Sequence, residues 1–415
     1  MEDEKHSRRP STYTDDPHIE KEGLKTYMFI FDDDGTMMAC AVCAQAGEML
    51  VCDQVTQLFK PSISNRGMDS TGKICQKNTI KVLSLYDGIS TGYYCLTLLG
   101  FKIDSYYAFE IDVNAINVSK MNFSDKITHL GDVEKFTYDQ ISYLCPFDLV
   151  IGGSPCNDLS AVNPNRKGLY AHDGTGRLFF EYDRVLKAVQ SLSPNPVFWL
   201  YENVASMPLA YRKTINRFLN CEPSLIDAKY FSAQRRPRFY WGNIPGMSTL
   251  AEVITEGSPS LSSAIMMSCK RVAAVDKLNT VTTQRNSLKP EETHLIRSKN
   301  LLRKVKTSES VRFLKSLLTF SAAFNSELAA SPCLRTLDAG SSRNQLPVLM
   351  DGTLTSIWVT ELEEVFGFPR HFTDVGNLGT QQRLSLLGKS WSTQVIVNIF
   401  HSLRHFFYTE PGVAL

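Results

Sequence analysis

The sequence predicts an α/β protein built on a doubly wound, Rossmann-like mixed sheet with helices on both faces. From Ile80 onward, short apolar runs rich in β-branched residues alternate with amphipathic helical patterns. Several of these runs end in Asp, Glu or Gly, as strands do where a parallel sheet binds a ligand. A chain of 415 residues with 43% hydrophobic residues can also bury a large core.

The individual elements follow from these periodicities. Four strands are predicted over Lys81–Tyr86, Asp104–Phe109, Phe147–Ile151 and Val197–Tyr201, and a further strand is expected to end at Gly131. Asp227–Tyr230 and Arg238–Gly242 are predicted to form a hairpin. Helices are predicted over Gly92–Leu99, Val113–Asn122, Tyr138–Leu144, Arg177–Leu192, Arg212–Asn220, Val359–Phe366 and Thr393–Phe407.

These elements divide the chain into segments. Residues 80–242 form the predicted core, and residues 346–415 return to it. Residues 243–345 are polar and irregular between them. Upstream, residues 1–24 are a polar leader, residues 25–58 form a small cysteine-bearing island, and residues 59–79 are a linker rich in Ser, Lys and Gly.

Composition narrows the class of protein. No stretch approaches the roughly 20 apolar residues that span a bilayer, and the N-terminus lacks the apolar core of a secretion signal. We therefore expect an intracellular protein with reduced thiols and no membrane contact. The net charge of +1 still allows nucleic-acid binding where basic residues cluster on one face.

Acidic residues recur at successive strand ends and predict a cofactor site. Asp87, Glu110 and Asp132 follow the first three strands of the core. A carboxylate after the second strand is placed to accept ribose hydroxyls, and one after the third can accept from an adenine amino group. No G-x-G-x-x-G is present, so the cofactor should be smaller than a dinucleotide. Taken singly, each acidic residue could instead cap a helix.

A second pattern predicts covalent chemistry. Cys156 follows Gly152-Gly153-Ser154-Pro155, and Glu202 ends the next apolar strand. Arg236 and Arg238 begin the strand after that. A lone cysteine is more often a small buried hydrophobe, but a loop at the ligand edge of a sheet suits a nucleophile. Strand-end capping and phosphate-positioning or solvated arginines are the alternatives for the others.

The ordered motifs resemble the DNA (cytosine-5) methyltransferases, and specifically their de novo, type 3 branch in an invertebrate-like or truncated form. Asp87-Gly88, Gly153-Ser154-Pro155-Cys156, Glu202-Asn203-Val204, Arg236-Pro237-Arg238 and Gly388-Lys389-Ser390-Trp391 carry the family likeness. Residues 155–160, 163–170, 174–181, 365–369 and 371–375 carry the likeness to the branch.

The resemblance implies a class I fold and a reaction. A methyl group would pass from S-adenosylmethionine to carbon 5 of a cytosine flipped out of double-stranded DNA, through a covalent adduct between Cys156 and carbon 6. Glu202, Arg236 and Arg238 would be the other catalytic residues. The cofactor would contact Tyr86, Asp87, Gly88, Ile89, Ser90, Thr91, Glu110, Ile111, Asp132, Val133, Glu134, Leu178, Lys389, Ser390 and Trp391.

The resemblance also implies contacts with DNA and with other protein chains. The DNA-contacting residues would be Val162, Asn163, Arg166, Lys167, Thr282, Thr283, Arg285 and Asn286. Residues 243–345 would be the target-recognition region, with an insertion at 291–345. Gln284 departs from the vertebrate pattern and leaves the sequence preference open. Phe179 and Phe180 resemble an oligomerisation contact, and helix core is their equal alternative. Thr380 departs from a second interface pattern.

The N-terminal island resembles a truncated form of the cysteine-rich, ADD-type module that reads histones in this branch. Tetrahedral zinc needs four ligands, and Cys40, Cys43 and Cys52 supply three at most. We therefore predict that the island does not bind zinc normally and reads the histone H3 tail weakly. The family implies a location in the nucleus.

Two other functions remain as alternatives. A non-catalytic regulatory partner of an active methyltransferase is one, but such partners lose the Pro-Cys and Glu-Asn-Val motifs that this chain keeps. An RNA methyltransferase of the type 2 branch shares the chemistry, and Asn157-Asp158-Leu159-Ser160 argues against it.

Overall fold

The computed structural model describes residues 29–31, 37–40, 76–251, 259–265, 269–281 and 346–410. Two units divide the chain, residues 1–66 and residues 67–415. In the first unit, β1 (Phe29–Phe31) pairs antiparallel with β2 (Met37–Cys40). All other described elements belong to the second unit.

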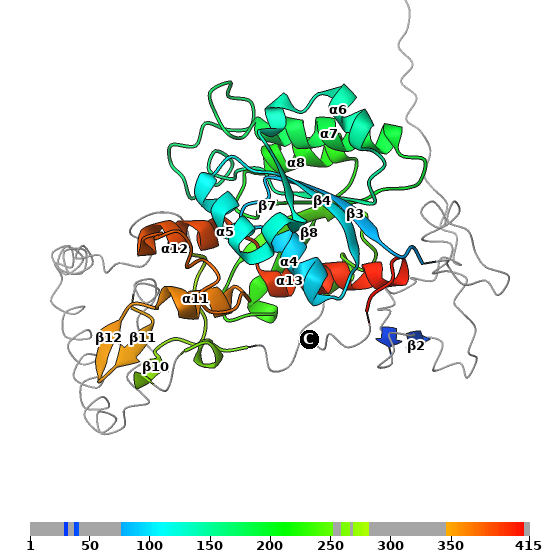
Figure 1. Cartoon of the computed structure of the whole chain (residues 1–415). Coiled ribbons are helices and arrows are strands. Elements are labelled where there is room, and N and C mark those ends of the chain that lie inside the picture. Colours follow the sequence, from blue (N-terminus) through cyan, green and yellow to red (C-terminus); the bar gives the residue numbers. More distant parts are fainter. Residues whose placement is uncertain are drawn as a thin grey trace, which may run out of the picture. The chain divides into compact units, whose positions relative to one another are not determined.

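A seven-stranded mixed sheet forms the centre of the second unit, in the order β5-β4-β3-β6-β7-β9-β8 (Figure 1). The strands β3 to β7 are parallel, and β9 runs antiparallel to both β7 and β8. Their bounds are β3 Ile80–Leu85, β4 Ile103–Phe109, β5 Thr128–Gly131, β6 Leu149–Gly152, β7 Phe198–Val204, β8 Ser224–Asp227 and β9 Pro237–Gly242. The order reverses beside β3, which is where such sheets bind ligands.

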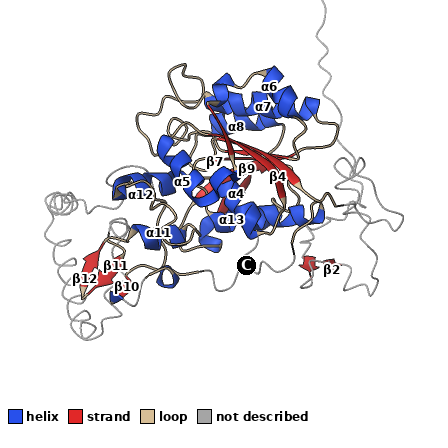
Figure 2. Ribbon diagram, viewed as in Figure 1, coloured by secondary structure: helices blue, strands red, loops and turns tan. Residues whose placement is uncertain are grey.

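Helices cover both faces of this sheet (Figure 2). One face carries α4 (Thr91–Leu98) and α13 (Thr393–His401), which share a buried cluster with the strands. The other face carries α6 (Tyr138–Leu144), α7 (Leu178–Leu192) and α8 (Leu209–Leu219). The sequence prediction of a Rossmann-like sheet with helices on both faces is confirmed.

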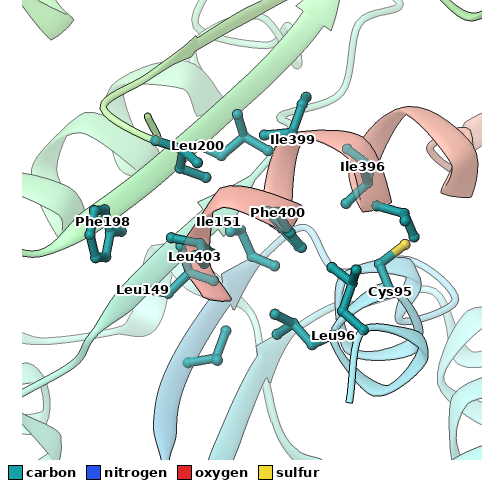
Figure 3. Close-up of a cluster of buried hydrophobic side chains, with 14 of the residues drawn as sticks. Cys95, Leu96, Leu149, Ile151, Phe198, Leu200, Ile396, Ile399, Phe400 and Leu403 are labelled. Atoms are coloured by element: carbon teal, nitrogen blue, oxygen red, sulfur yellow. The ribbon is translucent and has the colours of Figure 1, made fainter. Parts of the chain in front are cut away.

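The face under α13 illustrates how the core is built (Figure 3). Ile396 and Phe400 of α13 are fully buried, and the α13 residues share a cluster with Ile151 of β6 and Leu200 of β7. Burying one such side chain contributes about 1.5–3 kcal/mol. Because α13 lies near the end of the chain and β6 near its middle, this packing closes residues 346–410 onto the core.

A small sheet joins the middle of the chain to its C-terminal part. Its strands are β10 (Arg271–Ala273), β11 (Val348–Met350) and β12 (Thr353–Thr355), all antiparallel. Arg271 forms a bidentate ion pair with Glu361 of α11 (Val359–Val365), at 2.7 and 2.8 Å, and both side chains are fully buried. The remaining helices are α5 (Val113–Phe123) and α12 (Thr380–Lys389), which pack with α11 in a third cluster.

Several predicted boundaries need correction. Residues 228–230 form a 3-10 turn instead of a strand, so β8 lies earlier, at Ser224–Asp227. The side chain of Asp227 caps that turn by accepting from the N–H of Lys229. Helix α8 begins at Leu209, just after Pro208, and α13 ends at His401 before a further 3-10 turn. Within the described ranges, no helix is both long and apolar enough to cross a membrane.

Candidate active site

The loop after β3 lies at the carboxyl edge of the sheet and is held by Glu110. Gly88 has φ +59°, a conformation that favours glycine, and its N–H donates to Oε2 of Glu110 at 2.9 Å. Oε1 of Glu110 accepts from the backbone N–H groups of Ile111 and Asp112, each at 2.8 Å. Glu110 therefore joins the loops after β3 and β4, and Oε2 retains a lone pair for another donor.

Asp87 is supported from three sides by hydroxyl groups. Ser84 Oγ and Tyr106 Oη donate to Oδ1, at 2.5 and 2.7 Å, and Ser90 Oγ donates to Oδ2 at 2.5 Å. Burial raises the pKa of Asp87 to about 6, against the effect of these hydrogen bonds. The carboxyl group thus orders the backbone of the loop that a cofactor would approach.

The neighbouring surface suits an adenosyl group. Ile111 is 73% exposed beside Glu110, whereas Val133 is buried in the core. Asp132 lines a pocket of about 410 Å³ together with Phe109 and Phe136. An acidic acceptor next to an uncovered apolar side chain can hold the ribose and one face of a purine, so the residues fit the expected cofactor.

Two distant segments reach this edge of the sheet. The hydroxyl of Tyr86 donates to the backbone carbonyl of Leu178 at 2.7 Å. Lys389 pairs with Asp112 at 3.1 Å. The predicted cofactor residues on four stretches of the chain are therefore brought to one rim, although the contacts with a cofactor themselves stay a prediction.

Glu202 lies at the centre of the predicted catalytic group. Its Oε1 pairs with Nε of Arg238 at 2.9 Å, and both side chains are nearly buried. Its Oε2 accepts from the indole N–H of Trp391 at 2.9 Å. The pairing of β7 with β9 places Val204 opposite Arg238, which explains why residues 34 to 36 positions apart in the sequence share a site.

Cys156 lies in the loop after β6, half-buried, with a free thiol. Burial raises the pKa of this thiol, while the charge of Arg238 lowers it and that of Glu202 raises it. The loop is tied to β7 because Asn203 donates to the carbonyl of Ser154 at 3.2 Å and to the hydroxyl of Tyr201 at 3.0 Å. A sulfur atom at this position is a nucleophile once it loses its proton.

Arg236 has a different set of contacts from Arg238. It is 4% exposed and donates to the backbone carbonyls of Gly388 and Ser390, at 3.0 and 2.8 Å. Burial lowers its pKa to about 9, and the nearby charge of Arg238 acts in the same direction. The side chain therefore fastens β9 to the segment that carries Trp391, and a direct part in catalysis stays a prediction.

A family model described as C-5 cytosine-specific DNA methylase matches residues 80–405. The chain belongs to this family. This chain is 37% identical to the DNA (cytosine-5)-methyltransferase DRM2 from Arabidopsis thaliana over 122 residues, which is 27% of this chain and 19% of that protein. The orphan methyltransferase M.SPRI from Bacillus phage SPR is 30% identical over 173 residues, 39% of this chain and 37% of that protein.

The matches thus cover less than two fifths of the length of either relative. A solved structure of the Entamoeba histolytica methyltransferase EhMeth has a TM-score of 0.50 and 14% identity, and covers 79% of this chain and 98% of that one. This likeness concerns the fold alone. Family membership and fold agree with the motif order read from the sequence.

Hydrogen bonds to Asp158 order the loop that the family resemblance leads us to expect will close on DNA. Asp158 accepts from the N–H of Lys167 at 3.0 Å and from the N–H and hydroxyl of Thr175, at 2.7 and 2.9 Å. Burial raises the pKa of Asp158, but these hydrogen bonds outweigh it and the net shift is downward. Val162, at the tip of the loop, is 66% exposed.

The polar residues of this loop mostly contact one another. Asn163 donates to the carbonyl of Asn157 at 3.0 Å, and Arg166 donates to the carbonyl of Asn163 at 3.3 Å. Lys167 pairs with Asp173 at 2.6 Å. Their proposed contacts with DNA stay predictions.

The adjacent residues Phe179 and Phe180 differ in burial, which bears on the two roles considered for them. Phe179 is fully buried in the core. Phe180 is half-buried, stacks on Tyr170 at 5.7 Å between ring centroids, and meets Phe218 edge-on at 5.1 Å. Phe180 is thus the one with partly accessible surface, and oligomerisation through it stays a prediction.

Some predicted site residues lie outside the described residues, namely Thr282, Thr283, Arg285, Asn286, Cys43 and Cys52. Cys40 is the last residue of β2, where only the backbone is described. Among the residues whose placement is described, no group of three or more His, Cys, Asp or Glu side chains could hold a metal ion.

Sequence reasoning did not anticipate the contact between Trp391 and Glu202 or the role of Asp158 in the loop. The glycine at position 153 is the one sequence feature related to the contact between Trp391 and Glu202. A Cβ added there would lie 2.9 Å from Oε2 of Glu202 and 3.2 Å from Nε1 of Trp391. A glycine before a predicted nucleophile therefore marks a close approach of other side chains.

Proposed function

We propose that this chain is a DNA cytosine-5 methyltransferase of the de novo branch that acts in the nucleus. The observation that carries the proposal is the group formed by Cys156, Glu202 and Arg238 at the carboxyl edge of a Rossmann-like sheet. Family membership supports the reaction type. The branch motifs at residues 155–170 support the de novo assignment.

Each residue has a defined task in the proposed reaction. The thiolate of Cys156 adds to carbon 6 of the cytosine, and the electron pair of the 5,6 double bond moves toward carbon 5 and N3. Glu202 donates a proton or a hydrogen bond at N3, which stabilises the charge that develops on the ring. Arg238 holds Glu202 and lowers the pKa of the thiol.

The cofactor supplies an electrophilic methyl group next to carbon 5 when it is bound. Glu110 and Asp132 would hold its ribose and adenine, and Lys389 and Trp391 would close the other side of the site. After transfer, a base removes the proton from carbon 5 and the sulfur of Cys156 leaves by elimination, which restores the double bond. Val162 would fill the space vacated by the flipped base.

Labelled methyl transfer to double-stranded DNA tests this proposal. Cys156→Ser should abolish transfer, and Cys221→Ser is the matched control because Cys221 is also half-buried but lies after α8, away from Glu202. A covalent complex with DNA containing 5-fluorocytosine should form with the wild-type chain and the control only. Transfer that survives Cys156→Ser would rule out the mechanism.

The same assay separates the alternatives. A regulatory partner would co-purify with an active methyltransferase and neither bind the cofactor nor transfer label. An RNA methyltransferase would label transfer RNA in preference to duplex DNA. The Pro155-Cys156 and Glu202-Asn203-Val204 motifs, which regulatory partners lose, favour an enzyme.

A further inference from the structure

Both oxygens of the Glu202 carboxyl group accept hydrogen bonds from other side chains. Arg238 Nε lies 2.9 Å from Oε1, and Trp391 Nε1 lies 2.9 Å from Oε2. Hydrogen bonds on both oxygens fix the rotation of the carboxyl group about its last single bond. Trp391 is half-buried and packs against the core cluster under α13, so its ring cannot turn freely.

The surroundings of Trp391 also hold it in place. Arg236 donates to the carbonyls of Gly388 and Ser390, which brackets the backbone just before Trp391. On the opposite side, Gly153 leaves the room that the indole and the carboxylate share, because any Cβ there would lie 3.2 Å from Nε1. Arg236 and Gly153, which are far apart in the sequence, thus both help to position the indole ring of Trp391.

We propose that Trp391 is a positioning residue for Glu202, whose indole N–H fixes the carboxyl group in the orientation used for catalysis. The proposal rests on the proposed function and adds a role that is separate from any contact of Trp391 with the cofactor. A cytosine offers two polar atoms on the edge that Glu202 would meet, N3 and the amino group at carbon 4. A carboxyl group that rotated freely would present its oxygens to this edge only part of the time.

Trp391→Phe tests the proposal because it keeps an aromatic ring and removes the N–H. Loss of one hydrogen bond to a carboxylate should lower kcat about tenfold, equivalent to ~1.4 kcal/mol. The affinity for S-adenosylhomocysteine, measured by calorimetry, should stay within twofold. Trp241→Phe is the matched control, since Trp241 also donates its indole N–H, to Asn216 at 2.8 Å, and belongs to the buried cluster under α7 and α8.

A double-mutant comparison separates positioning from general damage. In a Glu202→Ala background, which has no side-chain acceptor for the indole N–H, single-turnover rates should change less than twofold when Trp391→Phe is added, because Trp391 acts through the carboxyl group. An equal loss in both backgrounds would overturn the proposal. Weaker binding of S-adenosylhomocysteine with an unchanged kcat would also overturn it, since Trp391 would then serve the cofactor alone.

A measurement without turnover distinguishes failure of this proposal from failure of the proposed function. The chain has four tryptophans, so a ¹⁵N-labelled sample gives four indole N–H signals. The signal lost in Trp391→Phe should shift in Glu202→Gln, while the signal lost in Trp241→Phe should not. An unshifted Trp391 signal would overturn the proposal even if the wild-type chain methylates DNA. A shifted signal in a chain that transfers no methyl group would support the hydrogen bond and reject the proposed function.

Discussion

The ion pair between Arg238 and Glu202 should control both the stability of the site and the reactivity of Cys156. Arg238→Ala removes the ion pair of Glu202, whose side chain is 12% exposed in the wild-type chain, and leaves the hydrogen bond from Trp391. Removing one partner of a buried pair costs 3–5 kcal/mol. Because one hydrogen bond survives, we expect a loss of about 3 kcal/mol in the free energy of unfolding.

The thiol provides a second and more specific measurement. Burial raises the pKa of Cys156, and Arg238 has the largest lowering effect on it. Arg238→Ala should therefore move the pH dependence of Cys156 alkylation by iodoacetamide to higher pH. Following the Cys156 peptide by mass spectrometry separates it from the nine other cysteines.

Arg235→Ala serves as the control because Arg235 is exposed and lies two residues before the start of β9. Urea unfolding measures the first effect, and alkylation at several pH values measures the second. If Arg238→Ala and Arg235→Ala gave the same alkylation profile, the electrostatic reasoning about this site would be refuted. A loss of stability below about 1 kcal/mol would mean that the pair behaves as an exposed one.

Three further predictions concern other parts of the chain. The pKa of Asp87 is raised to about 6 in the folded state, so its contribution to the free energy of unfolding is full below about pH 4 and is lost as the pH rises through 6. The loss amounts to roughly 3 kcal/mol. Unfolding experiments at several pH values should show no such loss in Asp87→Asn. Arg271→Met removes the buried bidentate ion pair of Glu361, which keeps a hydrogen bond from the N–H of Trp358, and should cost about 3 kcal/mol in urea unfolding, part of it recovered by adding Glu361→Leu. Asp158→Ala should speed hydrogen exchange at the amide of Thr175 on the order of tenfold without a matching change in global stability.

Local sequence patterns were enough to predict the central sheet and most of the helices. Strands β3, β4, β6 and β7 lie within a few residues of the ranges expected from their apolar runs, and α6 matches its predicted bounds. These elements are specified by periodicity over fewer than 20 residues, which a single sequence displays directly. The strand ends then placed Asp87, Glu110 and Asp132 on one rim.

Features that depend on long-range pairing were beyond such reasoning. The strand β10 has three residues, and its partner β11 begins 77 positions later, so no local alternation marks either one. A buried ion pair between Arg271 of β10 and Glu361 of α11 links this sheet to the neighbouring helix, and no local sequence pattern predicts that these two residues are partners. The region containing β10 was accordingly predicted to be irregular.

The catalytic group shows the same limit at the level of side chains. Motif order identified Glu202, Arg236 and Arg238 as one set but could not tell their contacts apart. In the folded chain, Arg238 pairs with Glu202, whereas Arg236 donates to the carbonyls of Gly388 and Ser390, more than 150 positions away. Two arginines that look alike in the sequence therefore differ in their contacts, because the fold brings different acceptors to each guanidinium.

The C-terminal segment accordingly does more than complete the core. It supplies Lys389 beside Asp112 at the cofactor rim and Trp391 beside Glu202 at the catalytic group. These two residues are only two positions apart, and Arg236 fixes the backbone around them. We predict that a cofactor that displaced Lys389 from Asp112 would also shift Trp391, so that binding at the predicted cofactor site and the orientation of Glu202 would be coupled. Such coupling is reciprocal: a cytosine bound at Glu202 would change the affinity for the cofactor by the same factor by which the cofactor changes the affinity for cytosine.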